Sequence, residues 1–437
     1  MDKFNIVNDH FIRKLSLKRV TFFGLLLWLI IYFFSNVEII HGINFMGLLY
    51  IAICYIALFA GFLHSNDKIK AKNYIVISKS LKTILYISLC IAVIAFLFKV
   101  FDKFFIRGIS LNNNTIENRE ILTENSSTIF GVLGAILTPF AFIPLFLYYV
   151  INKKNIWLFS ICLLVFLSTI FENVLLGARF GILMTLILLA LYIFHFKNIR
   201  VNRKMKFAII LVLLAFSLVA TKMFLERTKE FAVTDKVAIN HILTNAGYNY
   251  TIKPTNAYKE EIINSNNKII KLAKLAKMNL SQYYIHGVFE FNYLYSNYDK
   301  PHQYGAYMFS IVPKFSNILF GTSIDLEEIS DSMTRKGVYT TFFGPLFVDF
   351  GWLGPVFMFC FGLFQSVVYN KVLNKNFKYL PLLFFFYIID FFIPVINFIV
   401  SAQGLYIIIA FITFIAYYKL LVFRKVIKEN KLTLKNS

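Results

Sequence analysis

The chain has 437 residues, of which 58% are hydrophobic and 18% aromatic, and its formal net charge is +22. A soluble protein of this length does not need so much apolar surface, so the composition excludes a soluble globular domain. The positive charge does not indicate a nucleic-acid partner, because no zinc finger, glycine-rich phosphate loop or nucleotide-binding fingerprint accompanies it.

Ten apolar stretches have the length of about 20 residues that a helix needs to cross roughly 30 Å of hydrocarbon. Because an unpaired backbone is too costly in lipid, we expect helices and an all-α polytopic membrane protein. The first span has no small-residue cleavage site, so we interpret it as a retained anchor. The predicted spans are 19–35, 43–63, 80–101, 130–150, 156–174, 180–196, 206–225, 344–369, 379–398 and 403–423.

These spans divide the chain into three regions. Residues 1–225 contain spans one to seven, residues 226–341 form one large outer loop with short helices, and residues 342–437 contain spans eight to ten and a tail. With the N-terminus in the cytoplasm, the cytoplasmic segments contain 25 Lys and Arg residues, and the short outer segments contain 4. This bias predicts that both termini are cytoplasmic, and it explains most of the net charge.

Three arginines interrupt the short outer loops, which otherwise carry almost no positive charge. Arg107 and Arg119 lie in FDKFFIRGISLNNNTIENREILTEN (101–125), and Arg179 lies in the hairpin FENVLLGARFG (171–181). A guanidinium is a planar fork of donors, so arginines that converge on one cavity would form a diphosphate site. Arg119 and Arg179 are therefore catalytic candidates, and Arg107 is a candidate for substrate binding.

Local ion pairs are the alternative explanation for two of these arginines. Arg179 is close in sequence to Glu172, and Arg119 is close to Glu117 and Glu120. Exposed pairs of this kind are common and contribute little stability, so the sequence leaves both interpretations open.

The large outer loop is rich in tyrosine, with ten of the chain's 25 tyrosines between residues 245 and 310. A tyrosine has an apolar face and a polar tip, which suits both a membrane-interface belt and stacking on sugar rings. The density favours a groove for a polar, ring-containing ligand. Candidates for substrate binding in this loop are Tyr283, Tyr284, Arg335 and Tyr339.

Within the same loop, NNKIIKLAKLAKMNL (266–280) spaces four lysines three residues apart, at Lys268, Lys271, Lys274 and Lys277. The pattern predicts a short basic amphipathic helix that lies on the membrane surface near anionic lipid or a lipid-linked phosphate. A solvated lysine face over a packed apolar face is an equal alternative.

Three further side chains, His286, Glu290 and Asp349, are candidate bases, and Asp390 is a fourth notable acid with a structural or cavity-lining role. His286 and Glu290 are four residues apart in YYIHGVFEFNY and share one helical face. Asp349 lies at the head of span eight, where it either acts on the acceptor or holds an arginine from the rim of a water-filled cavity. Asp390 lies within span nine with Tyr387 one turn away as a possible partner.

No metal site is expected, because His286 and Glu290 lack a third ligand. The cysteines are Cys54, Cys90, Cys162 and Cys360, and all four fall inside predicted spans. We interpret them as apolar packing residues without disulfides.

Three elements together resemble one family, the bacterial O-antigen and oligosaccharide repeat-unit polymerases. GARFGIL resembles the family's arginine motif, NREILTEN its asparagine–arginine element, and KGVYTTFFGPLFVDFGWLGPVFMFCFGLF its closing element. YYIHGVFEFNY also follows the family's order, and the resemblance covers roughly residues 100–370.

The resemblance implies a membrane-embedded, metal-independent glycosyltransferase of the C-type architecture, without a cofactor. Its donor and acceptor would be undecaprenyl-diphosphate-linked oligosaccharides at the periplasmic face of the bacterial inner membrane. Membrane lipids and a chain-length regulator protein are the other expected partners. Two alternatives remain: an O-antigen ligase, which shares the arginine chemistry, and a flippase, which would favour short loops and internal repeats that this sequence lacks.

Overall fold

The structure is a computed structural model that describes residues 8–64, 78–110, 115–124, 128–151, 155–175, 179–197, 221, 235–245, 247–400 and 402–435. Nearly all regular structure in these ranges is helical. The strands β1 (Val37–Ile39) and β2 (Ile252–Pro254) form one small antiparallel sheet, with Glu38 opposite Lys253. Except for Thr221, the predicted span 206–225 lies outside the described residues.

Among the described residues, seven helical stretches are long and apolar enough to cross a membrane, and an eighth, Phe180–Phe196, is shorter. The all-α polytopic membrane fold is therefore confirmed. The seven stretches are Leu17–Phe34, Phe45–His64, Ser80–Ile106, Ile129–Ile151, Ile156–Leu175, Phe343–Leu373 and Gly404–Leu421.

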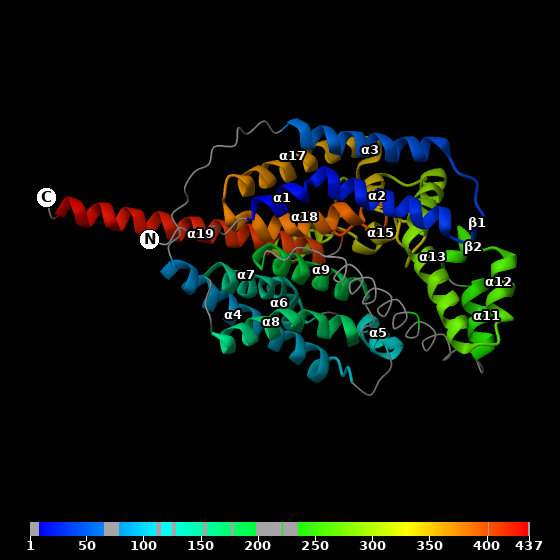
Figure 1. Ribbon diagram of the computed structural model, residues 1–437, viewed down its shortest axis with the longest axis horizontal. Coiled ribbons are helices and arrows are strands. Elements are labelled where there is room, and N and C mark those ends of the chain that lie inside the picture. The colour runs from blue at the N-terminus through cyan, green and yellow to red at the C-terminus, as the bar shows by residue number, and fades with distance from the viewer. Residues whose placement is uncertain are drawn as a thin grey trace.

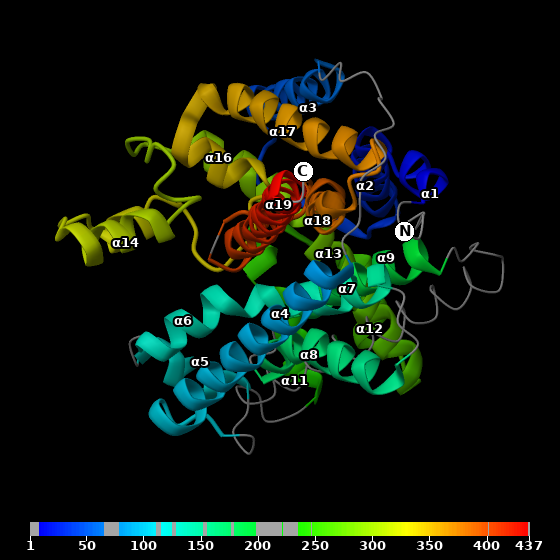
Figure 2. The same cartoon turned by 90° about the vertical axis from the view of Figure 1, so that its left-hand side faces the viewer.

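The membrane helices form two groups, with α18 (Leu380–Phe392) and α19 (Ala402–Lys435) between them (Figures 1 and 2). The first group contains α2 (Leu17–Phe34), α3 (Phe45–His64), α16 (Phe343–Phe350) and α17 (Gly354–Leu373), and α1 (Asp9–Lys14) precedes it. The second contains α4 (Ser78–Val100), η1 (Phe101–Ile106), α5 (Thr115–Glu124), α6 (Ile129–Leu137), η2 (Thr138–Ala141), α7 (Phe142–Ile151), α8 (Ile156–Leu175) and α9 (Arg179–Phe196).

The remaining elements belong to the region of the predicted outer loop. They are α11 (Asp235–Asn245), η3 (Gly247–Tyr250), α12 (Asn256–Ile263), α13 (Lys268–Asn297), α14 (Ile311–Phe320) and α15 (Leu326–Ser330). Figure 1 shows α11, α12 and the sheet at one end of the molecule and the end of α19 at the other. A small apolar core that includes Ile242, Tyr258, Ile262 and Leu275 joins α11 and α12 to α13.

Helix α13 corrects the prediction of a short basic helix at 266–280. It runs for 30 residues, from the lysine-rich stretch through His286 and Glu290, as one helix. No proline interrupts this stretch. The helix continues through Gly287, where the missing side chain allows close packing. A Cβ atom at Gly287 would lie 3.0 Å from the carbonyl oxygen of Val395 and 3.1 Å from the nitrogen of Thr341. The glycine thus lets two other segments approach the helix.

Two predicted spans are interrupted. The span at 344–369 is divided into α16 and α17 by the turn η4 (Gly351–Leu353), which begins at Gly351 with a φ of +51°. The span at 379–398 contains only η5 (Phe377–Tyr379) and the 13-residue α18. Helix α18 ends at Phe392 because Pro394 follows, and a proline cannot continue a helix. The irregular segment after it pairs Ile396 with Thr341 in an isolated bridge.

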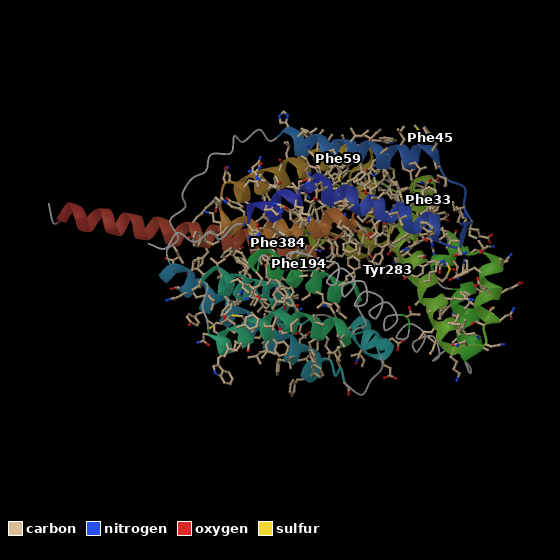
Figure 3. The ribbon with its side chains drawn as sticks, in the orientation of Figure 1. Phe33, Phe45, Phe59, Phe194, Tyr283 and Phe384 are labelled. Atoms are coloured by element: carbon tan, nitrogen blue, oxygen red, sulfur yellow. The ribbon has the colours of Figure 1, made fainter. Side chains whose placement is uncertain are left out.

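Close backbone contacts hold the first helix group together. A Cβ atom at Gly61 of α3 would lie 2.4 Å from the carbonyl oxygen of Phe359, and one at Gly362 of α17 would lie 2.5 Å from that of Leu58. Small residues of this kind let membrane helices pack closely. Close packing matters in a membrane because the hydrophobic effect does not drive helices together in lipid. Figure 3 shows side chains filling the space between the helices of both groups.

One polar pair is buried in this packing. The amide nitrogen Nε2 of Gln365 in α17 donates to Oδ1 of Asp390 in α18 over 2.8 Å. The partner of Asp390 is therefore Gln365 and not Tyr387, whose hydroxyl has no hydrogen-bond partner among the described residues. The four cysteines are free, and two of them, Cys54 and Cys162, are buried.

Candidate functional site

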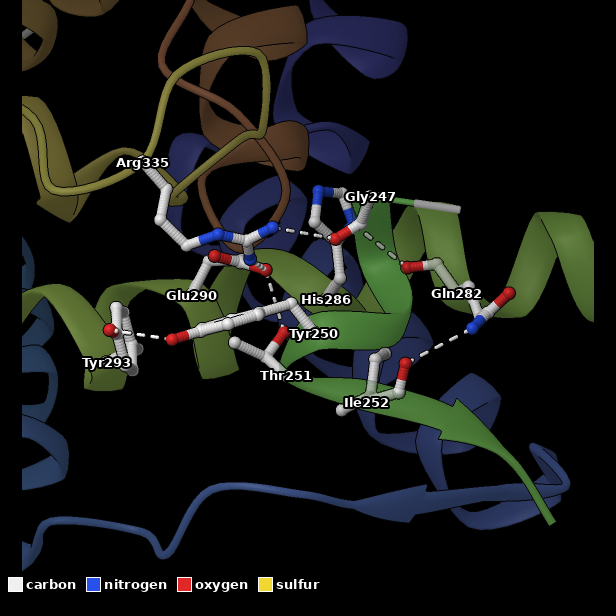
Figure 4. Close-up of polar contacts among 9 residues, drawn as sticks. All are labelled: Gly247, Tyr250, Thr251, Ile252, Gln282, His286, Glu290, Tyr293 and Arg335. Carbon is white, nitrogen blue, oxygen red and sulfur yellow. Dashed lines mark hydrogen bonds and ion pairs between the residues drawn. The ribbon is translucent and has the colours of Figure 1, made fainter. Parts of the chain in front are cut away.

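An ion pair between Glu290 and Arg335 forms the centre of the candidate site (Figure 4). Nη1 of Arg335 lies 2.5 Å from Oε1 of Glu290, which also accepts the hydroxyl of Thr251 at 2.8 Å. Nη2 of Arg335 donates to the carbonyl oxygen of Gly247 over 2.9 Å. The guanidinium thus joins α13 to η3 and to the segment that precedes α16.

Aromatic rings support this arginine from one side. The guanidinium carbon of Arg335 lies 4.1 Å from the centre of the Tyr250 ring, a cation–π contact. The hydroxyl of Tyr250 donates to that of Tyr293 over 2.8 Å, and His41 lies against both rings. A planar guanidinium can make all these contacts at once, whereas a lysine ammonium cannot.

His286 is fully buried one turn from Glu290. Its Nδ1 lies 2.9 Å from the carbonyl oxygen of Gln282 and 3.0 Å from that of Tyr283. Carbonyl oxygens only accept, so Nδ1 carries the proton and Nε2 of the neutral ring is an acceptor. Nε2 has no hydrogen-bond partner among the described residues.

Three tyrosine rings surround His286. The centre of the Tyr248 ring lies 4.6 Å from that of the imidazole, and Tyr283 and Tyr339 lie at 6.2 and 6.1 Å. Tyr283 and Tyr339 meet each other edge to face at 5.6 Å. The sequence-predicted residues Tyr283, His286 and Tyr339 are therefore brought together.

Burial is the main influence on the pKa values of His286 and Glu290. It lowers the pKa of His286 to about 4, and the positive charge of Arg335 acts in the same direction. Burial also raises the pKa of Glu290, against the opposing effects of the Thr251 hydroxyl and Arg335. At neutral pH, His286 is therefore uncharged, with Nε2 available as a proton acceptor.

Tyr339 also lines a cavity of about 320 Å³, which we call the α9 cavity. The first turn of α9, the segment 338–341 and the irregular chain before α19 surround it. Its polar lining is neutral and aromatic rings complete it; the lining includes Asn173, Phe180, Tyr307, Tyr339, Thr340, Thr341, Asn397 and Phe398. These groups suit a polar ring compound such as a sugar.

Thr341 in this lining has a strained backbone. Its φ is +62°, which is rare for a β-branched residue. The backbone nitrogen of Phe343 donates to its hydroxyl over 3.1 Å, and its bridge to Ile396 fixes the same segment. Backbone strain of this kind is concentrated at binding and active sites, which supports the interpretation of the α9 cavity as a ligand-binding site.

Of the two arginines of the sequence motifs, Arg179 is placed beside this region by its backbone position, and Arg119 lies on a separate helix. Arg179 is the first residue of α9, and Phe180 and Gly181 directly after it line the α9 cavity. Arg119 belongs to α5, where the neighbouring Asn118 donates to the carbonyl oxygen of Ser110 over 3.1 Å. The side chains of Arg119 and Arg179, and that of Glu172, lie outside the described residues, so their convergence stays a prediction.

The prediction that Asp349 lies at a water-accessible rim beside an arginine is wrong. The side chain is fully buried and accepts the backbone N–H groups of Tyr307 and Met308 over 2.9 and 2.7 Å. It therefore fixes the loop before α14 onto α16. The apolar stretch around Asp349 folds as a short helix against that loop, so the carboxylate faces protein instead of water.

Other predicted substrate residues lie elsewhere. Arg107 forms an ion pair with Asp102 in η1 and lines a different cavity. Tyr284 points into the helix packing near Phe392. Lys274 pairs with Glu261 at 2.7 Å, and Lys271 donates to the carbonyl oxygen of Ile263, so these lysines hold α12 instead of forming a free cationic face.

Gly247 and Thr251 are site residues that the sequence did not reveal. Gly247 in η3 contacts Arg335 through its carbonyl oxygen, and Thr251, between η3 and β2, contacts Glu290 through its hydroxyl. No motif or periodicity marks such residues, although the flanking tyrosines Tyr248 and Tyr250 belong to the noted cluster.

Among the described residues, no group of three or more His, Cys, Asp or Glu side chains is placed to hold a metal ion. Comparison of the chain with protein-family models, with curated proteins and with solved structures finds no match. Functional inference therefore depends on the geometry of the site and on the sequence motifs.

Proposed function

We propose that the protein is an O-antigen polymerase. It would join undecaprenyl-diphosphate-linked oligosaccharide repeat units by glycosyl transfer at the periplasmic face of the bacterial inner membrane. The α9 cavity carries the proposal, because its aromatic and neutral polar lining suits sugar rings and it begins directly after Arg179. The motifs around Arg119, Arg179 and Asp349 support the same family.

In the proposed reaction, a hydroxyl of one lipid-linked repeat unit attacks the anomeric carbon of the donor glycan. The bond from that carbon to the diphosphate oxygen breaks as the new glycosidic bond forms, and the hydroxyl proton passes to a base. Undecaprenyl diphosphate leaves, and the glycan on the acceptor is longer. The diphosphate is already a good leaving group, so the main demand is fixed positive charge, which Arg179 and Arg119 would supply.

His286 is the proposed proton acceptor. Its protonated Nδ1 is bound to the helix backbone, and its Nε2 has a free lone pair in the described structure. The three tyrosine rings close it off, so a substrate hydroxyl reaches Nε2 only when one ring moves. Tyr339 both lines the α9 cavity and lies against His286, and is therefore the ring that substrate would displace.

Glu290 has a positioning role in this scheme. Its Oε1 already accepts from Arg335 and Thr251, whereas Nε2 of His286 has no hydrogen-bond partner among the described residues. The pair instead fixes the segment between α15 and α16, from which Tyr339 projects. Arg335, expected to contact substrate, would likewise act through this segment.

Glycan ladders on gels test the proposed function in a strain that lacks the native gene. Loss of a polymerase leaves single repeat units on the lipid core, and the intact gene restores the ladder. A ligase would instead leave no glycan on the core, and a flippase would stop repeat units from reaching the periplasm. Either of those patterns contradicts the proposal.

Two substitutions at one position test the role of His286. An asparagine amide can replace Nδ1 and keep the backbone bond, whereas a glutamine amide oxygen can replace Nε2 as acceptor. If Nε2 serves the reaction, His286→Asn abolishes the ladder and His286→Gln retains part of it. If His286→Asn instead retains more activity than His286→Gln, only the hydrogen bond from Nδ1 to the helix backbone is required. His241→Ala, at an exposed position of α11, is the control for expression.

A further inference from the structure

A second cavity, of about 340 Å³, lies between η1, α6, α14 and α19, and we call it the α4 cavity. Its lining differs in character from that of the α9 cavity because four cationic side chains and one carboxylate contribute to it. They are Lys99, Lys103, Arg107, Lys314 and Asp102. Lys99 and Lys103 have other interactions as well, so Arg107 and Lys314 carry the argument.

Asp102 holds Arg107 in place. Its Oδ2 lies 3.2 Å from Nε of Arg107, and its Oδ1 accepts the hydroxyl of Thr128. Both partners of the ion pair are buried, with 2% of the aspartate and 8% of the arginine side chain exposed. The observed pair uses Nε, and a guanidinium has four further N–H donors on its terminal nitrogens for a ligand.

The backbone of η1 and α6 also packs closely around Asp102. η1 is a π-helical turn, a form that is rare and often marks functional positions. A Cβ atom at Gly131 would lie 2.6 Å from Oδ2 of Asp102, so only a glycine allows α6 this close. The arginine is thus preorganised by a helix distortion and by a close helix contact.

Several large apolar side chains close in sequence to lining residues of the α4 cavity are exposed. Leu97, Phe101, Phe105 and Ile129 are large exposed hydrophobic residues on α4, η1 and α6. In a membrane protein, such a surface contacts acyl chains. A ligand that enters the cavity from this side therefore comes from the bilayer.

Helix α14 combines an exposed apolar surface with a cationic residue of the cavity. Its exposed Val312, Leu319 and Phe320 form an apolar surface, while Lys314 lines the α4 cavity. Figure 2 shows α14 projecting from the molecule apart from the main helix groups. An amphipathic helix of this kind lies at the depth of lipid headgroups.

We propose that the α4 cavity binds the phosphate group of a membrane lipid, with Arg107 and Lys314 as its principal ligands and the acyl or prenyl chain along α4 and α6. The phosphate belongs either to an anionic phospholipid or to a polyprenyl carrier. The site shares no lining residue with the α9 cavity, so the proposal does not depend on glycosyl transfer.

Lipid binding to the purified full chain in a neutral detergent tests this proposal, with the rise in melting temperature as the readout. The probes are dioleoylphosphatidylglycerol, undecaprenyl phosphate, sodium pyrophosphate, and dioleoylglycerol, which lacks the phosphate. Both phosphate-bearing lipids should stabilise the protein more than dioleoylglycerol and free pyrophosphate do, and the tighter of the two identifies the source. Equal stabilisation by dioleoylglycerol, or by pyrophosphate, would overturn the proposal.

Lys314→Gln should weaken binding of the preferred lipid about fivefold, and Arg107→Gln about tenfold or more. Because Arg107→Gln leaves Asp102 buried without its cation, Asp102→Asn combined with Arg107→Gln keeps the test valid if the single variant is unstable. Lys336→Gln, at an exposed position that pairs with Asp331, is the matched control. Unchanged affinity in the folded Lys314 and Arg107 variants would show that the phosphate is not bound there.

Discussion

The carboxylate of Asp349 accepts the backbone N–H of Met308 over 2.7 Å, across 41 residues of sequence. A second N–H, from Tyr307, reaches the other carboxylate oxygen. A single buried side chain thus fixes the loop that leads to α14 against α16, and through Tyr307 it also shapes one wall of the α9 cavity.

Asp349→Ala should lower the free energy of unfolding by about 3 kcal/mol, since two buried N–H groups lose a charged acceptor. Asp325 offers a matched comparison, because it also accepts two backbone N–H groups but is exposed at the start of α15. Asp325→Ala should cost only about 1 kcal/mol. Thermal unfolding in detergent measures both, and equal losses would contradict the anchoring role of Asp349.

Arg335→Lys should reduce activity nearly as much as Arg335→Ala. A lysine cannot reach Glu290 and Gly247 together while its charge lies over Tyr250. Lys336→Gln is the adjacent control, because Lys336 pairs with Asp331 at the surface and should be nearly neutral. The glycan ladder is the measurement, with membrane levels checked by blot. Full activity of Arg335→Lys would show that the simultaneous contacts of the guanidinium are not required.

The stability of the protein should fall as the pH decreases from about 6.5 to about 4. Burial lowers the pKa of His286 from 6.5 to about 4, so in this window the unfolded state binds a proton that the folded state does not. The loss attributable to this group is at most about 3 kcal/mol, and it is absent above pH 6.5.

The contribution of Glu290 to the pH dependence of stability has the opposite sign. Its pKa is raised in the folded state, so protonation of this group favours the folded state. Comparing the wild-type protein with His286→Asn separates the two groups, since only the histidine contribution disappears in the variant. Melting temperatures between pH 4 and pH 8 should therefore decrease less steeply for His286→Asn. Parallel curves would mean that folding does not lower the pKa of His286.

Arg179→Lys and Arg119→Lys should fail nearly as badly as the alanine variants, with the protein still present in the membrane. The proposed diphosphate site needs two fixed guanidinium forks, whereas a lysine supplies a point charge at a different reach. A local pair with Glu172 predicts instead that lysine rescues Arg179, and that Glu172→Gln is as damaging as Arg179→Ala. Complete ladders from both lysine variants would exclude the diphosphate site.

A reporter fused after residue 300 should be active only outside the cytoplasm, and one fused at the C-terminus only inside. The reason is the excess of Lys and Arg in the segments that the span prediction places on the side of the termini. Alkaline phosphatase and green fluorescent protein fusions measure the two cases. The reverse pattern would put the whole candidate site in the cytoplasm.

The sequence predicted the helices whose apolar run is long and uninterrupted, including α2, α3 and α8. It did not predict the early end of α18 or the turn at Gly351, because hydropathy reports lipid compatibility and not backbone continuity. Residue type and spacing singled out His286, Glu290 and Tyr339, which the structure brings together, and their roles stay predictions. The partners of Asp349 are backbone N–H groups of a distant loop, and local pattern does not encode such contacts.

The length of α13 has a mechanical consequence. At a rise of 1.5 Å per residue, its 30 residues form a rod of roughly 45 Å, with Lys268 at one end and His286 beyond its middle. A helix with unbroken hydrogen bonds does not bend at low cost, so a displacement of the lysine end is transmitted to the imidazole as a tilt. Helices α11 and α12 pack against the lysine-rich end of α13. A movement of these two helices would therefore shift the position of His286, the proposed proton acceptor.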